Sequence, residues 1–244
     1  MKKSILFTAI IGALLLMTSC LKEGNSNYAY TTFVYLDSDD MGTVYGKTIS
    51  PYFDTRSIIS DEMLLMMPNR IKIMSYSWDE VNGTKPLRIN GEVIQADYVT
   101  STSESVDVDH TYLNMTELPE IEEPLEFIQL LSPLSAISPD FMGDYWIFEY
   151  MYEVPSGQSP VVEFYKREQD NPESDEVVID VHLKHVSSST NIKANIHYVA
   201  LNMSELRSEY ENSGKEKIEL KFVYHEKGKN DPIEIDVSMK LKMD

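Results

Sequence analysis

Apolar and polar residues alternate along much of the second half of the chain. In residues 233–242, IEIDVSMKLK, every odd position is apolar and every even position is polar or charged. Successive side chains of a strand point to opposite faces, so this segment predicts a strand with one buried and one solvated face. Similar patterns cover 125–131, 145–152, 161–166, 177–185, 195–201 and 218–224. Seven short strands separated by turn residues favour a seven-stranded antiparallel β-sandwich.

The first half of the chain is also rich in strand patterns, although they are less regular. Candidate strands cover 30–36, 44–52, 70–78 and 87–100, the last with a kink near Gly91. These strands would suit a small β-barrel. Residues 117–124, ELPEIEEP, are acidic, contain two prolines and predict a linker. We therefore expect an N-terminal β-domain at 29–116 and a C-terminal β-sandwich domain at 125–244.

Capping signals predict three short helices. Asn114 and Asn202 each precede a glutamate by three residues, the spacing of a capping box. Gly214 is a stop signal for the second of these helices, and Pro119 limits the first to about one turn. A third short helix is expected to begin near Ser60.

The start of the chain has a different pattern. It begins with MKK, continues with an apolar run at 5–17, and reaches TSC at 18–20, where Cys20 is the only cysteine. The run is too short to span a bilayer, and a basic start with small residues before a cut site is typical of a secretory signal. The segment resembles a bacterial lipobox, with Met17 in place of the usual Leu. That resemblance implies a signal peptide at 1–19 and acyl chains, such as palmitate, on Cys20.

The residues that follow Cys20 bear on where the protein is held. Residues 20–28 are polar and predict a flexible lipidated tether. Lys22 and Glu23 resemble the sorting signal that sends lipoproteins of one Gram-negative phylum to the outer-membrane surface; a solvated charge pair is the alternative. We expect an outer-membrane, lipid-anchored protein in the cell envelope, with the periplasmic and the surface-exposed orientation both open.

The net charge of the chain restricts the classes of partner that it can bind. It has 21 basic and 40 acidic residues, a net charge of −19. Residues 1–19 hold two lysines and no acidic residue, so the remainder has a net charge of −21, from 19 basic and 40 acidic residues. Such a surface repels phosphate backbones and anionic lipid head groups. We expect no nucleic-acid partner and attachment to the membrane through the acyl chains on Cys20.

Catalytic and metal-binding motifs are not recognisable. His182 and His185 are three residues apart on a predicted strand, so they point to opposite faces. Residues 37–42, DSDDMG, begin like a calcium loop, but Met41 and Thr48 occupy positions where the EF-hand pattern needs oxygen ligands and a glutamate. We therefore expect no metal site, no cofactor and no enzymatic activity, with a weak cation site at 37–42 as the alternative.

An aromatic row is the strongest candidate for ligand stacking. Trp146, Phe148, Tyr150 and Tyr152 occupy alternate positions of one predicted strand and share a face. If that face is exposed, the rings could stack on sugar rings. If it is buried, they form half of the sandwich core. The sequence leaves both alternatives open.

Several short segments together resemble the NigD-like lipoproteins. Residues 69–76, NRIKIMSY, are similar to a strand of that family, with Asn69 where Gly is expected. Residues 143–147, GDYWI, resemble the start of its C-terminal domain. Residues 183–185, LKH, and 201–206, LNMSEL, resemble two further segments. The resemblance implies an OB-like β-barrel followed by an immunoglobulin-like β-sandwich, a link to bacteriocin operons, and no established activity.

These observations lead to an expectation about function. We expect a non-enzymatic, lipid-anchored cell-envelope protein that acts as a binding or assembly module for a periplasmic or extracellular protein or glycan. One alternative is a surface glycan- or peptide-binding accessory lipoprotein. A second, implied by the family resemblance alone, is a bacteriocin-associated, immunity-like envelope protein. An envelope hydrolase that uses surface carboxylates is a third. The oligomeric state is not defined by the sequence.

Overall fold

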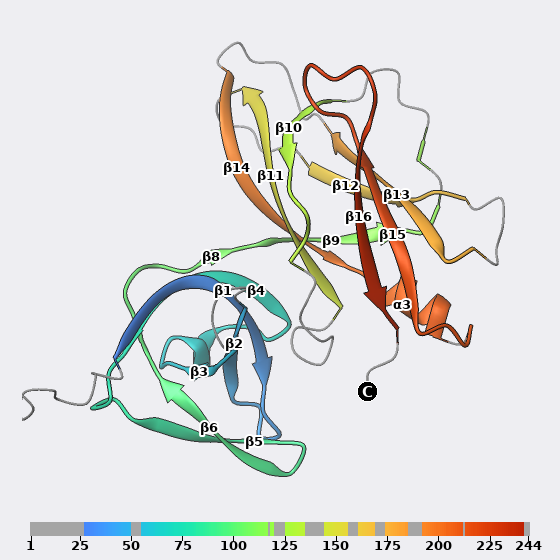
Figure 1. Ribbon diagram of the computed structural model, residues 1–244. Coiled ribbons are helices and arrows are strands. Elements are labelled where there is room, and N and C mark those ends of the chain that lie inside the picture. The colour runs from blue at the N-terminus through green and yellow to red at the C-terminus, as the bar shows by residue number, and fades with distance from the viewer. Residues whose placement is uncertain are drawn as a thin grey trace, which may run out of the picture.

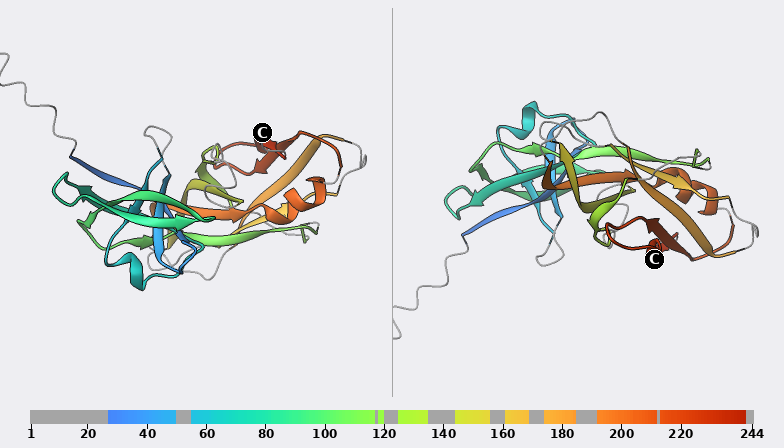
Figure 2. Two further views of the ribbon diagram at one scale, coloured as in Figure 1. Left: turned by 90° about the horizontal axis from the view of Figure 1, so that it is seen from below. Right: turned by 90° about the horizontal axis from the view of Figure 1, so that it is seen from above.

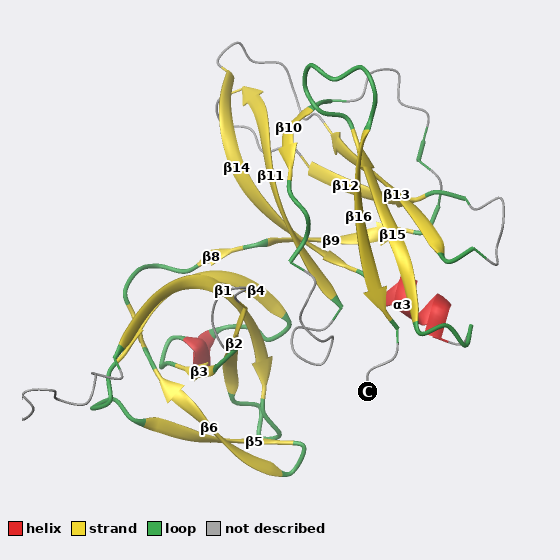
Figure 3. Ribbon diagram, viewed as in Figure 1, coloured by secondary structure: helices red, strands yellow, loops and turns green. Residues whose placement is uncertain are grey.

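The structure is a computed structural model that describes residues 27–49, 55–116, 118–119, 125–134, 144–155, 161–168, 174–184, 192–211 and 213–241. Strands dominate these residues, and two short helical segments accompany them (Figure 3). The strands form two eight-stranded sheets, one from residues 28–107 and one from residues 109–240. The protein is all-β, with an OB-like half-barrel followed by a β-sandwich, and this confirms the predicted fold class.

The N-terminal sheet curves into the half-barrel in the lower part of Figure 1, with the order β5-β6-β3-β2-β1-β4-β7 and β8 beside β4. β1 is an internal strand of this sheet and pairs antiparallel with both β2 and β4. The elements are β1 (Tyr28–Ser38), β2 (Val44–Ile49), β3 (Ser57–Ile59), the 3-10 helix η1 (Met63–Leu65), β4 (Arg70–Trp78), β5 (Thr84–Ile89), β6 (Glu92–Tyr98), β7 (Thr100–Ser101) and β8 (Val106–Asp107).

One predicted strand of this half is wrong. Residues 87–100 were expected to form a kinked strand, whereas β5 and β6 are two antiparallel strands of a hairpin. Asn90 and Gly91 form its turn with φ angles of 53° and 83°. Both central residues of this tight turn need positive φ, which Asn and Gly tolerate. The Asn-Gly pair therefore reverses the chain instead of bending a continuous strand.

The C-terminal domain is a two-layer sandwich in the upper part of Figure 1, with the sheet order β10-β11-β14-β9-β12-β13-β15-β16. Neighbouring strands pair antiparallel except β14–β9, β9–β12 and β13–β15, which are parallel and differ from the predicted antiparallel pattern. The elements are β9 (Asp109–Asn114), β10 (Phe127–Leu130), β11 (Tyr145–Pro155), β12 (Val161–Lys166), β13 (Glu176–Lys184), β14 (Ile192–Asn202), the helix α3 (Ser204–Glu211), β15 (Lys217–Tyr224) and β16 (Ile233–Lys240).

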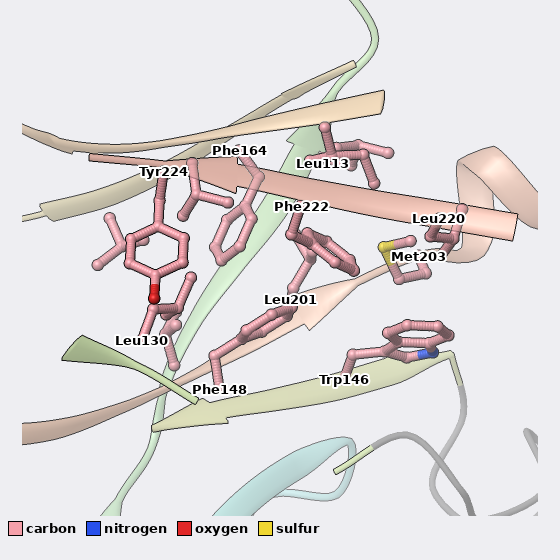
Figure 4. Packing of buried hydrophobic residues seen from close by; sticks show 14 of the residues in the cluster. Leu113, Leu130, Trp146, Phe148, Phe164, Leu201, Met203, Leu220, Phe222 and Tyr224 are labelled. Carbon is pink, nitrogen blue, oxygen red and sulfur yellow. The ribbon is translucent and has the colours of Figure 1, made fainter. Parts of the chain in front are cut away.

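The sandwich core lies between the layer of β11 and β14 and the layer of β12, β13 and β15 (Figure 4). Phe148 of β11 packs against Phe164 and Phe222 of the opposite layer, with ring centroids 5.0 and 4.9 Å apart. All three are fully buried. Aromatic pairs at such distances contribute beyond their buried area, so this trio anchors the two layers together.

β9 connects the two domains, which lie end to end in the views of Figure 2. It was expected within the N-terminal domain at 29–116, but it pairs with β14 and β12 of the sandwich. The chain therefore passes from the first sheet to the second at Val108, before the 117–124 segment that the sequence suggests as a linker. Residues 117 and 120–124 of the predicted linker lie outside the described residues, so the linker and the domain boundaries that it defines stay predictions.

An apolar interface joins the domains. The outward residues of β11 and β14 meet β1 and β4 of the half-barrel, and Phe33 packs edge-on against Tyr198 with centroids 5.1 Å apart. Backbone bonds continue across the joint: Val108 N donates to Ile71 O at 3.0 Å. The buried members are Tyr35, Ile49, Ile71, Val108, Ile147 and Ala200. This burial makes the two domains share one small core at their contact.

The helix α3 starts and ends as its sequence predicts. Asn202 Oδ1 accepts a hydrogen bond from Ser204 N at 2.9 Å, and Gly214 follows the helix with a φ of 78°. Asn114, in contrast, is the last residue of β9, and its Nδ2 donates to Phe164 O at 2.9 Å. The expected helix start at Asn114 is therefore wrong, because the Asn114 side chain is hydrogen-bonded to the neighbouring strand β12 and does not cap a helix.

Candidate functional site

The predicted lipidation and sorting residues, Cys20, Lys22 and Glu23, lie outside the described residues. Their roles stay predictions. Within the described ranges, no helix is long and apolar enough to cross a membrane.

The aromatic row belongs to the sandwich core. Trp146, Phe148, Tyr150 and Tyr152 are between 0% and 5% exposed, and they point from β11 toward the opposite layer. Figure 4 shows Trp146 and Phe148 directed at the side of Phe222. A sugar ring cannot reach rings that are this deeply covered, so the ligand-stacking interpretation of these four residues is corrected to a packing role.

The acidic turn at 37–42 uses its carboxylates to hold backbone. Asp39 Oδ1 accepts hydrogen bonds from Met41 N at 2.9 Å and Thr43 N at 2.7 Å. Burial alone would raise the pKa of Asp39, but hydrogen bonds from backbone N–H groups lower it below its ordinary value. Asp40 accepts from the N–H groups of Asn90 and Gly91. The two carboxylates therefore tie two hairpin turns together and are not presented to a cation.

Two of the described histidines, His110 and His182, are at least half-buried. His110 lies in the domain interface, where its Nε2 accepts a hydrogen bond from Ile71 N at 3.1 Å. Burial, and then the charge of Arg70, lower the pKa of His110. Burial likewise lowers the pKa of His182. No group of three or more His, Cys, Asp or Glu side chains in the described part of the chain is arranged to hold a metal ion.

A groove of about 530 Å³ lies on the half-barrel, between η1 and the loop that joins β7 to β8. β7 and β8 both pair with β4, at Ser101–Tyr76 and at Val106–Ile73. The residues between these two contacts, 102–105, belong to neither strand and form one wall, with Thr102 N donating to Ser75 O of β4 at 2.9 Å. Glu62 and Met66 form the other wall. We call this feature the N-domain groove; its lining is Glu62, Met66, Ser101, Thr102, Ser103, Glu104 and Ser105.

An exposed apolar segment borders the groove. Met63 is fully buried and anchors the short helix, with Ser60 Oγ accepting from Met63 N at 3.3 Å. The next residues then face outward: Leu64 is 49% exposed, Leu65 91% and Met67 69%. Large apolar side chains that are exposed together mark interaction sites more often than chance. We call residues 64–67 the apolar segment.

Polar side chains line most of the groove beside this apolar segment. Its lining supplies hydroxyl groups and the carboxylates of Glu62 and Glu104, and it contains no His, Lys or Arg. Such a set can accept hydrogen bonds and attract cations. The arrangement is suited to binding.

An aromatic cluster lies behind Met66 in the same domain. It consists of Tyr28, Tyr30, Tyr76 and Trp78, with Met66 packed against the same apolar core. Tyr28 stacks on Trp78 with centroids 5.5 Å apart and donates its hydroxyl proton to Asp97 at 2.6 Å. Burial, and then the hydrogen bond to Asp97, raise the pKa of Tyr28. Because Met66 lines the groove and packs against the same core as these rings, the cluster supports this wall of the groove.

Reasoning from sequence did not identify this groove. Its two walls come from 62–66 and 101–105, which are far apart in the chain: η1 lies against β2, whereas Ser101 pairs with β4, and β1 pairs with both of these strands. One local signal was present: residues 63–67, MLLMM, are a continuous apolar run without strand alternation, ended by Pro68. An apolar run that is too short for a buried helix can be exposed in a loop.

Comparisons with known proteins concern the fold as a whole. No family model and no curated protein matches the chain. Among solved structures, a candidate lipoprotein of Bacteroides fragilis is 12% identical with a TM-score of 0.58, covering 88% of this chain and 99% of that one. A NigD-like immunity protein of Bacteroides caccae is 12% identical with a TM-score of 0.52, covering 88% and 98%.

A third solved structure, a candidate toxin-related protein of Parabacteroides distasonis, is 8% identical with a TM-score of 0.52, covering 88% of this chain and 94% of that one. The likeness extends over nearly all of each neighbour, so both domains and their order are shared. At such low identity it concerns architecture and not activity. The chain therefore has the two-domain fold of a NigD-like protein, as the resemblance of its sequence segments implied.

Proposed function

We propose that the protein is a non-enzymatic, lipid-anchored protein of the cell envelope that acts as a binding module, with the N-domain groove as its contact surface. One observation carries the binding role: Leu65 and Met67 are 91% and 69% exposed beside a groove of about 530 Å³. Apolar side chains of this size are unfavourable in contact with water, and a partner that covers them lowers the free energy of the complex. The lipoprotein-like start of the sequence supports the envelope location.

The anchoring part predicts a simple change in fractionation. Cys20→Ala removes the thiol that would carry the acyl chains, so the protein should move from the membrane pellet to the soluble fraction. Cys20→Ser serves as a second variant with a similar side chain. Retention of both variants in the pellet, after a carbonate wash, would contradict lipid anchoring.

The binding part is tested in intact cells with a photo-crosslinking amino acid. Placed at Leu65, it should yield a discrete crosslinked species. The control position is Val81, which is 93% exposed on a different loop of the same domain. Equal yields at both positions, or none at Leu65, would contradict the groove as the contact surface.

A second candidate function is a role in immunity or toxin biology. Two solved structures with the same fold are described as a NigD-like immunity protein and as toxin-related. If this chain has such a role, expressing it in a sensitive strain should raise survival beside a bacteriocin-producing strain. Unchanged survival, with the protein confirmed in the envelope, would count against it.

A further inference from the structure

We infer that the N-domain groove binds a basic peptide segment of a protein partner that also presents an apolar side chain. This inference rests on the proposed binding function and adds the chemistry of the partner. It is drawn from the exposed apolar segment, the acidic lining of the groove and the charge of the whole chain.

The apolar segment gives the first requirement on the partner. Leu65 and Met67 project into solvent, while Met66 lies between them and lines the groove. Covering a leucine or methionine side chain stabilises a complex by removing apolar surface from water. A partner must therefore bring an apolar side chain to this edge, and a fully polar ligand would leave the segment exposed.

The lining of the groove gives the second requirement. Glu62 and Glu104 face it from opposite walls, and no ion pair involves either carboxylate among the described residues. The nearby lysine, Lys85, is engaged elsewhere: its Nζ lies 3.5 Å from Asp61 and over the ring of Tyr98. The groove thus has two carboxylates to offer to lysine or arginine side chains of a ligand.

The net negative charge of the chain also favours a basic partner. With a net charge of −19, the protein attracts a basic partner over a distance and repels an acidic one. Electrostatic complementarity of this kind raises association rates and selects against wrong partners. A glycan would gain less here, because the lining of the groove contains no aromatic ring that could stack on a sugar.

The experiment measures binding of short fluorescein-labelled peptides to the full chain in detergent micelles by fluorescence anisotropy. The probes are a leucine–lysine peptide, a leucine–glutamate peptide and a leucine–serine peptide. A neutral oligosaccharide, maltoheptaose, competes as the non-peptide alternative. We expect the leucine–lysine peptide to bind tightest, with weaker binding at high salt, and maltoheptaose not to displace it.

Two groove variants and two matched controls locate the binding. Glu62→Gln with Glu104→Gln should weaken binding of the leucine–lysine peptide about threefold to tenfold, as expected for exposed charge pairs. The control, Glu216→Gln with Asp231→Asn, changes the net charge equally at exposed sites of the other domain. Leu65→Ser should weaken binding about tenfold, and Val81→Ser should leave it unchanged.

Four results would overturn the inference. Equal losses in groove and control charge variants would show attraction by the whole chain and no docking in the groove. Preference for the acidic or neutral peptide would refute the basic partner. Displacement by maltoheptaose would indicate a glycan site. A discrete crosslink from position 65 in cells without any basic-peptide binding would keep the proposed function and refute this inference alone.

Discussion

The ion pair between Arg207 and Asp144 offers a stringent test of how the sandwich is held together. Arg207 Nε donates to Asp144 Oδ1, and Arg207 Nη1 donates to Lys240 O at 2.5 Å. The two side chains are 10% and 14% exposed. The pair joins α3, the residue just before β11 and the end of β16, so one guanidinium connects three elements that are distant in sequence.

The perturbation is Asp144→Ala, which removes the carboxylate and leaves the guanidinium buried. Breaking a buried pair on one side costs about 3–5 kcal/mol, because the remaining charge has lost its partner and its water. A change of about 1 kcal/mol shifts the melting temperature of a protein of this size by roughly 2–4 °C. We therefore expect Tm to fall by on the order of 10 °C.

A double variant separates the charge from the packing. In Asp144→Leu with Arg207→Met, both charges are replaced by apolar groups, and such replacements are often neutral or stabilising. We expect the double variant to be closer in stability to the wild type than Asp144→Ala. In a double-mutant cycle with Asp144→Leu and Arg207→Met as the single variants, the two effects should be strongly non-additive, since the residues share one contact.

The assay follows urea unfolding by tryptophan fluorescence. The chain contains two tryptophans, Trp78 in the half-barrel and Trp146 in the sandwich core. In a Trp78→Phe background, Trp146 alone reports on the sandwich, whose core lies close to the ion pair. If Asp144→Ala lowered the free energy of unfolding by less than about 1 kcal/mol, the reasoning would be refuted, because the pair would then contribute no more than an exposed salt bridge does.

Three further predictions concern the half-barrel and the domain interface. Gly46→Ala should destabilise the protein by about 1–3 kcal/mol, because the added Cβ would lie 2.5 Å from Val34 Cγ1; an unchanged urea midpoint would contradict this. Asn69 has a φ of 60°, and its Oδ1 accepts a hydrogen bond from Tyr35 Oη at 2.9 Å. Asn69→Ala should lower the free energy of unfolding by about 1–2 kcal/mol, because alanine is strained in the left-handed region. Asn69→Gly should lower it less in the same urea unfolding experiment. Because burial lowers the pKa of His110, the unfolded state binds its proton more tightly, and stability should fall as the pH drops below about 6.5. His110→Gln should reduce this loss between pH 7.5 and pH 5.5, and equal losses in variant and wild type would count against it.

Local pattern determined the position of most strands. The predicted ranges 70–78 and 161–166 coincide with β4 and β12 at both ends. Alternation is a property of neighbouring residues, so it is visible without the fold. Asn69 shows the same for a single residue. The family resemblance predicts Gly at this position, and the observed φ of 60° is one that both Gly and Asn tolerate. Turn and cap chemistry, as at Asn202 and Gly214, was likewise readable.

What the sequence by itself determined was therefore the all-β class, the positions of most strands and the acidic charge. Tertiary structure alone decided which face of β11 is buried, since alternation is identical whichever side meets the core. It also decided that β9 joins the sandwich and that 62–66 meets 101–105 to form the groove. Those outcomes depend on which distant strands pair, and pairing is chosen by the burial of the whole sheet and not by any single segment.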